Sequence, residues 1–451
     1  MSARFIPLHR LLKADRPDEL TVCHDGERFI NWTEFSSRTV ALAGALAAMP
    51  QQRWLLSHDN ACEFAIWFLA LLHAEKRIVL PPNTQPGTLA LLQHAFDAVA
   101  GDIPLPKAAA FEIGTFDPNL AGIDLYTSGS TGMPKCINKT LRQLECEVAT
   151  LETVWGDALQ DATMLATVPH HHIYGLLFRL LWPLCTGRTF DAVISTHPDI
   201  LQQRAALLGP HALIASPAHL SRLPELLSAS AWHPAPTLVF SSGGPLLPAA
   251  AQHFSHHFGH APTEVFGSTE TGGIAWRCQD QGEWWTPFPD IEVSNDDNQA
   301  AWLRSPLLTS HDAWPLDDIL EFADDGKFRL CGRRDRVVKI EGKRISLTDI
   351  EARLREHAWV ENAAAIALTQ QRQSIGAVIV LNERGRQVQR EGGRSLLNRE
   401  FRHHLAHFYE PVLQPRHWRY PDQLPFNAQG KTTQVALMEL FAMANDEPAT
   451  A

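Results

Sequence analysis

Short hydrophobic runs alternate with stretches of helical periodicity through most of the chain. Residues 64–72, FAIWFLALL, are apolar on every side and predict one buried helix, and RIVLPP at 77–82 predicts a short buried strand after it. The runs ATMLATVP, HALIASP and PTLVFSSGG end in turn residues, and helical patterns such as AHLSRLPELLSA lie between them. This alternation predicts an α/β fold with parallel or mixed sheets and with ligands bound at the loops that follow the strands.

The pattern changes near residue 330, where charged residues become frequent. FRLCGR and RVVKIEG predict two strands that meet at a turn, and SLTDIEARLREHA predicts a helix capped by Ser346 or Thr348. We therefore expect a large, multi-layer N-terminal α/β domain over residues 1–334 and a small α+β domain over residues 335–451.

Composition narrows the class of protein and its location. Of the 451 residues, 45% are hydrophobic and 20% are charged, as in soluble globular proteins, and a net charge of −11 argues against a nucleic-acid partner. The seven cysteines contain no CxxC pair, which disfavours a disulfide framework or a zinc ribbon and favours a reducing compartment. The N-terminus lacks a signal-peptide pattern, and the longest apolar run is too short to span a bilayer. We expect a cytoplasmic protein with no integral membrane segment.

Candidate chemistry concentrates in one loop, LYTSGSTGMPKCINKT, at residues 125–140. Its small residues leave backbone N–H groups free to face an anion, its hydroxyls add donors, and Lys135 adds a cation, a combination that suits a polyphosphate. The spacing is not that of the Walker loop, because Gly129 and Gly132 are three apart and Cys136 follows the lysine. The segment CINKT predicts a strand where a Walker loop would have a helix. The alternative is a polar surface loop without a ligand.

A second cluster, the histidines at 170–172, does not predict a metal site. Adjacent side chains on an extended segment point to opposite faces, so the three cannot converge on one ion. On the same reasoning, Tyr174 would face the same side as His172.

The segment YTSGSTGMPK resembles the phosphate loop of the AMP-forming adenylating enzymes, a superfamily that includes acyl- and aryl-CoA synthetases, luciferases and peptide-synthetase adenylation domains. Further segments resemble the superfamily's other motifs, in order. They are VPHHHIYGL of the acid pocket, SSGGPL of the adenine loop, EVFGSTETG, the ribose and hinge region LDDILEFADDGKFRLCGRRDRVVKIEGKRISLTDIE, and LPFNAQGK of the C-terminal loop. Within the superfamily, the chain is similar to members that accompany aryl polyene or fatty-acid-type synthases.

The resemblance implies a set of ATP-binding residues. Thr269 would contact the α-phosphate, Glu270 would hold Mg²⁺, and Phe266, in place of the usual tyrosine, would stack on adenine. Asp318, eight residues before Gly326, and Arg333 would hold the ribose, although Leu316–Asp317 replaces the usual Thr-Gly and leaves Asp317 open as an alternative. The remaining implied ATP contacts are Thr127, Ser128, Gly129, Ser130, Thr131, Gly132 and Lys135 at the β- and γ-phosphates, with Gly243, Gly244, Gly267 and Ser268 near the nucleoside.

The resemblance also implies residues for the acid, the thiol and domain motion. His172, Tyr174, Gly272 and Gly273 would line the acid pocket, the two glycines forming a slot for a flat ring. Lys431 would bridge the substrate carboxylate and the ATP oxygens. Asp335 would be the hinge of a mobile C-terminal domain, and Gly342 would line the thiol tunnel.

The implied activity is ATP-dependent conversion of a carboxylic acid to an acyl-AMP with release of pyrophosphate, followed by transfer to a phosphopantetheine thiol. The acceptor would be CoA or an acyl carrier protein, and the favoured acid is a hydroxybenzoate or hydroxycinnamate, with a fatty acid as the alternative. Two other classes remain open. One is a non-catalytic relative that binds a carrier protein. This class is disfavoured because all five charged motif residues are present, namely Lys135, Glu270, Asp318, Arg333 and Lys431. The other is a kinase, which the absence of a Walker lysine disfavours.

Overall fold

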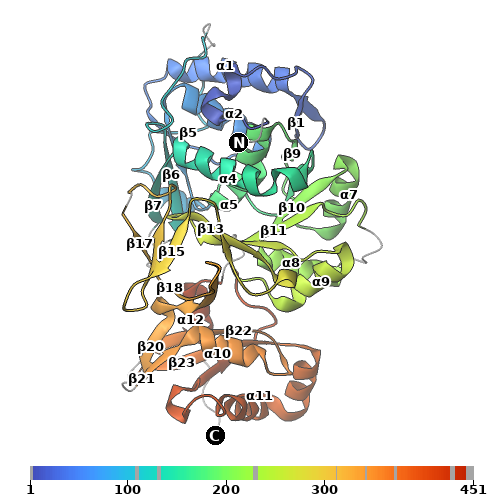
Figure 1. Cartoon of the computed structure of the whole chain (residues 1–451), viewed down its shortest axis with the longest axis vertical. Coiled ribbons are helices and arrows are strands. Elements are labelled where there is room, and N and C mark those ends of the chain that lie inside the picture. The colour runs from blue at the N-terminus through green and yellow to red at the C-terminus, as the bar shows by residue number, and fades with distance from the viewer. Residues whose placement is uncertain are drawn as a thin grey trace. The chain divides into compact units, whose positions relative to one another are not determined.

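The computed structural model describes residues 4–106, 111–128, 134–226, 232–310, 312–340, 343–369, 373–426 and 432–442 (Figure 1). The chain divides into two compact units. The first comprises Met1–Glu292 and Arg304–Ala313, and the second comprises Val293–Leu303 and Trp314–Ala451.

The larger sheet of the first unit has nine strands. Its order is β14 (Thr286–Pro287), β13 (Gly272–Cys278), β12 (Thr263–Ser268), β11 (Leu238–Ser242), β10 (His211–Ala215), β8 (Thr163–Ala166), β9 (Phe190–Asp191), β1 (Thr21–His24) and β2 (Phe29–Asn31). The strands from β12 through β1 run parallel, and β13, β14 and β2 are antiparallel to their neighbours. The mixed sheet arises because tight turns join β12 to β13 and β1 to β2, whereas helical crossovers join the parallel strands.

A second sheet of the same unit carries the strands that flank the candidate phosphate loop. Its order is β5 (Ala98–Val99), β3 (Arg53–Leu55), β4 (Arg77–Leu80), β6 (Gly122–Ser128) and β7 (Pro134–Thr140). β7 is antiparallel to β6, with Thr127 opposite Lys135. The loop between them thus begins and ends at adjacent strand positions.

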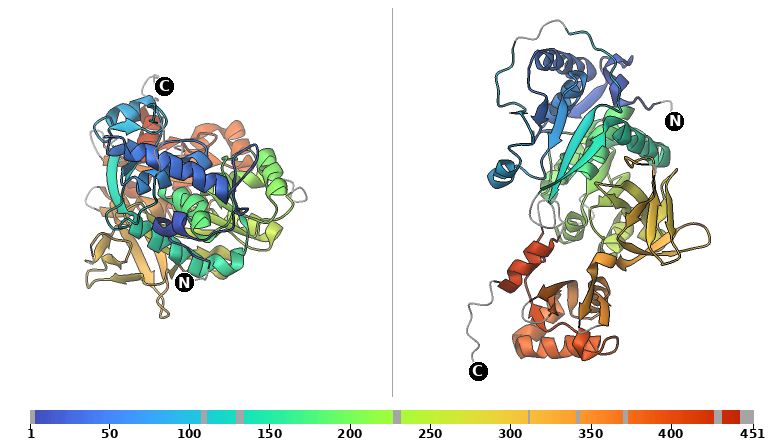
Figure 2. Two further views of the ribbon diagram at one scale, coloured as in Figure 1. Left: turned by 90° about the horizontal axis from the view of Figure 1, so that it is seen from above. Right: turned by 90° about the vertical axis from the view of Figure 1, so that its left-hand side faces the viewer.

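Helices cover these sheets. They are α1 (Trp32–Ala47), α2 (Ala61–His73), α3 (Pro86–Leu91), α4 (Leu141–Leu159), α5 (Ile173–Gly175), α6 (Trp182–Thr186), α7 (Pro198–Leu208), α8 (Pro217–Leu226) and α9 (Pro248–Phe258). α2 is buried almost throughout, as its uniformly apolar sequence predicts, and packs against α1 (Figure 2). α7, α8 and α9 share one core with β8, β10 and β11 through apolar residues such as Leu213, Leu220 and Phe254.

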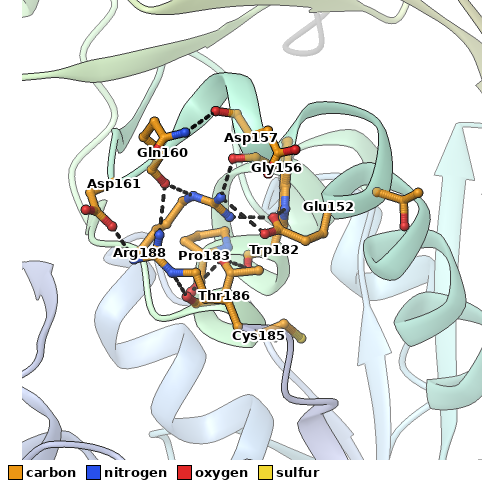
Figure 3. Close-up of polar contacts among 12 residues, drawn as sticks. Glu152, Gly156, Asp157, Gln160, Asp161, Trp182, Pro183, Cys185, Thr186 and Arg188 are labelled. Carbon is orange, nitrogen blue, oxygen red and sulfur yellow. Dashed lines mark hydrogen bonds and ion pairs between the residues drawn. The ribbon is translucent and has the colours of Figure 1, made fainter. Parts of the chain in front are cut away.

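α4 is fixed at both ends. A capping box closes its N-terminus, where Thr140 and Gln143 hydrogen-bond each other's backbone N–H groups. Near its C-terminus, the buried guanidinium of Arg188 contacts the Glu152 carboxylate at 2.6 Å and donates to the Gly156 carbonyl at 3.0 Å (Figure 3). A buried charge needs such partners, so this network sets the position of the helix against the segment after α6.

The second unit is built on a three-stranded sheet, β22 (Val360–Thr369), β23 (Gln373–Leu381) and β24 (His417–Arg419). Alternate residues of β22 and β23 point to opposite faces. One face packs on α10 (Leu347–Arg355) and α11 (Glu383–Leu405), and the other packs on α12 (Gln434–Ala442). The remaining strands are β15 (Glu292–Asn295), β16 (Ala301–Arg304), β17 (Trp314–Leu316), β18 (Asp318–Phe322), β19 (Phe328–Arg333), β20 (Val337–Ile340) and β21 (Lys343–Ser346).

Most predicted elements are confirmed, including the α/β class, the buried helix α2, the strands β4, β8, β10 and β11, and the strand β7 after the phosphate loop. Ser346, and not Thr348, caps α10, since its side chain accepts from the Asp349 N–H. FRLCGR and RVVKIEG form the strands β19 and β20, which meet at the short turn Arg334–Arg336 as expected. The two strands do not pair with each other, because β19 pairs with β18 and β20 pairs with β21. The predicted domain boundary stays a prediction, and Asp335 lies between β19 and β20 inside the second unit.

Candidate active site

Two segments far apart in the sequence meet at the end of β7. The Lys135 Nζ lies 2.8 Å from Oε1 of Glu270, and Thr127 Oγ1 donates to the Lys135 carbonyl at 3.4 Å. The structure therefore brings together three residues that the sequence assigned to ATP. Gly129, Ser130, Thr131 and Gly132 lie outside the described residues, as does the side chain of Ser128.

Glu270 lies in the three-residue turn Thr269–Thr271 that joins β12 to β13. Gly272 has a φ of +70°, the left-handed conformation that a hairpin loop of this length requires after the turn. A side chain at Gly267 would place its Cβ 2.3 Å from the Gly272 carbonyl oxygen. The Ser268 N–H donates to Thr271 Oγ1 at 3.0 Å, and the Thr271 N–H donates to Ser268 Oγ at 3.2 Å. These contacts hold the turn in one conformation.

The Glu270 carboxylate is ionised at neutral pH. Burial raises its pKa, but the hydrogen bond and charge of Lys135 outweigh burial, so the pKa lies below its ordinary value. A single carboxylate at a half-buried position fits Mg²⁺, which keeps most of its waters and takes few protein oxygens. Among the described residues, no three His, Cys, Asp or Glu side chains cluster to hold a metal ion.

Two charged side chains that were not predicted from the sequence contact the backbone of this turn. Lys139 Nζ donates to the Glu270 carbonyl at 2.8 Å and to the Leu307 carbonyl at 3.1 Å. Glu147 of α4 accepts the Gly273 N–H at 2.6 Å. The spacing of Lys135 and Lys139 within one strand places both on the same face, a signal that the sequence did carry. The contact of Glu147 depends on tertiary packing and leaves no such signal.

The expected adenine residues lie at neighbouring strand ends. Gly243, directly after β11, has a φ of +92°, which favours glycine. A Cβ at Gly244 would meet nothing closer than 4.0 Å among the described residues, so packing there does not require glycine. Phe266 in β12 has its ring 5.7 Å from that of Trp285. These positions are compatible with adenine binding, which stays a prediction.

The expected acid-pocket residues occupy different structural settings. His172 is the N-cap of α5 and Tyr174 lies within that helix, so the period-two argument that placed them on one side is wrong here. The Tyr174 hydroxyl donates to the Ala215 carbonyl at 3.2 Å, and burial raises its pKa well above the ordinary value, so it remains neutral. Tyr174 would therefore offer a substrate its ring and not its hydroxyl.

Gly272 and Gly273 pack against protein on the side where a side chain would project. A Cβ at Gly272 would lie 2.8 Å from Leu307 Cδ1, and one at Gly273 would lie 3.1 Å from Phe288 Cε2. A substrate ring could reach only the opposite side of these glycines. Their role in substrate binding stays a prediction.

The expected ribose residues both lie in the second unit. Asp318 and Arg333 are directly opposite each other in the antiparallel pair of β18 and β19, and the Asp318 residue is largely buried. The neighbouring Asp317 is exposed and has Oδ2 3.4 Å from Arg333 Nη2. Asp317 therefore contacts Arg333 by its side chain, whereas Asp318 lies opposite Arg333 in the strand pair, and the choice between the two aspartates stays open. Gly342 and Lys431 lie outside the described residues, as does the side chain of Asp335.

The fold matches solved structures along nearly its whole length. The benzoate CoA ligase from Burkholderia xenovorans aligns with a TM-score of 0.77 and 18% identity, covering 96% of this chain and 99% of that one. At 18% identity, the structural match establishes a shared fold.

Sequence comparison finds a matching family model and similar proteins. The model described as AMP-binding enzyme matches residues 113–298, which include the Lys135 loop and the Glu270 turn. The 4-coumarate–CoA ligase of Rhodobacter capsulatus is 29% identical over 307 residues, 68% of this chain and 73% of that one. The sulfoacetate–CoA ligase of Cupriavidus necator is 25% identical over 427 residues, 84% of this chain and 81% of that one. The part of the chain that holds both segments of the site is therefore similar to AMP-binding enzymes.

Proposed function

We propose that the protein is an acid–thiol ligase that converts a carboxylic acid to its acyl-AMP with release of pyrophosphate, and then forms a thioester. The observation that carries this proposal is the contact between Lys135 and Glu270, two motif residues 135 positions apart that meet at 2.8 Å. The family match and the CoA ligases among the relatives support the same reaction.

The Lys135–Glu270 pair places an ammonium and a carboxylate side by side, and these groups can bind a nucleotide's phosphate and its Mg²⁺ ion, respectively. The Lys135 side chain is 60% exposed and that of Glu270 is 27% exposed, and ion pairs so open to water contribute only about 0–1 kcal/mol to stability. A contribution to the stability of the fold therefore does not explain why these two side chains lie together. When Mg²⁺ and ATP bind, each side chain can exchange its partner, the ammonium for a phosphate oxygen and the carboxylate for the metal.

A displacement at a phosphorus atom of ATP is catalysed mainly by positioning the reacting groups and by stabilising the charge that develops on the phosphates. Mg²⁺ would neutralise charge that develops on the phosphates. In this chain Glu270 would hold the ion, Lys135 would hold the leaving phosphates, and Thr269 would donate to the α-phosphate. Lys431 would act on the substrate carboxylate, and Asp318 with Arg333 would bind the ribose.

For the acid we favour a hydroxybenzoate or hydroxycinnamate. The support is the ring of Tyr174 at the expected acid pocket, which packs on the buried ring of Phe178 with centroids 5.0 Å apart, together with a relative named for 4-coumarate. The acceptor thiol would be that of CoA or of a carrier protein, and the reaction would take place in the cytoplasm. No described helix is both long and apolar enough to cross a membrane. A fatty acid remains the alternative substrate.

Pyrophosphate release across a panel of acids tests the proposed substrate. Hydroxybenzoates and hydroxycinnamates should give a higher kcat/KM than octanoate or longer fatty acids. The reverse preference would contradict the aryl assignment while leaving acid activation intact. Omission of ATP or of acid is the control.

A further inference from the structure

We infer that Lys139 is a positioning residue that, with Glu147, clamps the Glu270 turn in the conformation needed for nucleotide binding. The inference rests on the proposed function for its catalytic meaning, but its geometry stands alone. Lys139 holds the backbone of Glu270 from the β7 side, and Glu147 holds the backbone of Gly273 from the α4 side. The two contacts bracket the turn that carries Thr269 and Glu270.

The strand geometry makes this arrangement direct. Lys135 and Lys139 are separated by four positions in β7, so their side chains leave the same face of the strand. The Lys135 ammonium reaches the Glu270 carboxylate, and the Lys139 ammonium reaches the Glu270 carbonyl, each at 2.8 Å. One strand thus binds both the side chain and the main chain of the same residue.

The two lysines differ in exposure, which separates their roles. Lys135 is open to solvent and can release Glu270 for a ligand, whereas Lys139 is only 4% exposed. Burial lowers the pKa of Lys139, and the nearby charges of Glu147 and Glu270 act against that shift. The Lys139 ammonium therefore keeps its hydrogen bonds to the backbone carbonyls of Glu270 and Leu307. The turn then retains its conformation when the Lys135 side chain moves to a phosphate.

Glu147 completes the clamp from the other side. It is buried, and burial raises its pKa, while the Gly273 N–H and the charge of Lys139 act in the opposite direction. A Cβ at Gly272 would lie 2.9 Å from Glu147 Oε2, so the glycine leaves room for this carboxyl. Burying two opposite charges seldom adds stability over an apolar pair, but it does fix the geometry of the groups they bind.

A matched control exists in the same unit. Lys76 is also buried, at 6% exposure, and donates to a backbone carbonyl, that of Met49, at 2.8 Å. Its partner Met49 precedes β3, and among the described residues no hydrogen bond joins Lys76 to the Glu270 turn. Lys76→Met and Lys139→Met therefore each remove one buried ammonium and its hydrogen bonds, but only the second removes a contact to the Glu270 turn.

The test combines amide hydrogen exchange of the ligand-free protein with pyrophosphate release. Lys139→Met should speed exchange in the peptide 267–274 by about ten-fold or more, the factor expected for losing one hydrogen bond to a charged group. It should also lower kcat and raise the Mg²⁺ concentration for half-maximal rate. Lys76→Met should change neither peptide 267–274 nor the Mg²⁺ dependence.

Unchanged exchange in peptide 267–274 for a folded Lys139→Met protein would overturn the inference, as would an equal effect of Lys76→Met. If Lys139→Met does not fold, Glu147→Leu provides the second test, because it removes the carboxylate oxygen that accepts the Gly273 N–H. Faster exchange in the same peptide would support the clamp, and wild-type exchange would overturn it. A wild-type protein that releases no pyrophosphate with any acid would contradict the proposed function, and the exchange data would still decide the clamp.

Discussion

Lys135 and Glu270 show what single residues can reveal before a structure is known. Both were predicted from motif residues, and their contact at 2.8 Å agrees with a shared site. Lys139 and Glu147 were not predicted, because their contacts form only when β7, α4 and the β12–β13 turn pack together, although the spacing of Lys135 and Lys139 already indicated a shared strand face. From the sequence alone, a charged residue is expected to be exposed to solvent, and only the structure shows that it is buried.

Glu270→Ala should lower the rate of pyrophosphate release by about two to three orders of magnitude, the usual cost of removing one preorganised charge-stabilising group. Glu34→Ala is the matched control, because Glu34 also pairs with a cation, Arg28, but on the exposed side of α1. Steady-state kinetics at limiting Mg²⁺ measures the effect. Equal turnover of the two variants would remove Glu270 from the site.

Helices and strands with strong periodicity were predictable, since burial of one face or of every face leaves a pattern in the sequence. The pairing of strands was less predictable. β19 and β20 follow each other closely in the sequence, yet each pairs with a different strand. The helix α5 at the predicted acid pocket was also missed, because three residues carry no periodicity. Pairing and short helices depend on contacts that local sequence does not record.

His73, at the C-terminal end of α2, gives a test of how buried elements respond to pH. Neither of its ring nitrogens has a hydrogen-bond partner among the described residues, and burial lowers its pKa to about 4. The unfolded chain takes up a proton near pH 6.5, before the folded protein does, so this histidine lowers stability as pH falls from 6.5 toward 4. Its contribution at pH 5.5 is about 1 kcal/mol lost relative to pH 8.

His73→Phe removes the titrating group and can keep the edge-to-face contact with Phe116, whose ring lies 5.1 Å away. Denaturant unfolding at pH 8 and pH 5.5 should show a smaller loss of stability in the variant than in the wild type. A variant that loses stability between these pH values as steeply as the wild type would contradict the assignment of a neutral, buried His73.

At the scale of the whole molecule, the structure confirms the α/β class, and the expected ATP residues fall in both units. Lys135 and Glu270 lie in the first unit, and Asp318 and Arg333 lie in the second. The sequence predicted a mobile C-terminal domain only through the superfamily resemblance, because a hinge is a property of motion and not of hydrophobic pattern. The alternation of that domain between two half-reactions therefore stays a prediction.

Domain alternation predicts that the two half-reactions separate genetically. Lys431→Ala should nearly abolish formation of acyl-AMP but still transfer the acyl group from supplied acyl-AMP to a thiol. Asp335→Pro, which restricts the backbone at the expected hinge, should form acyl-AMP but slow thioester formation. Rapid-quench assays of each step measure both. Equal loss of both steps in a folded Lys431→Ala protein would exclude the alternation mechanism here.

The central claim is that this chain activates a carboxylic acid by adenylation. Its most direct test is acid-dependent exchange of labelled pyrophosphate into ATP, followed by identification of the nucleotide product once a thiol acceptor is added. The account predicts exchange that requires both the acid and Mg²⁺, and AMP as the only nucleotide product. Formation of ADP, or an exchange rate that no acid in the panel increases, would contradict it.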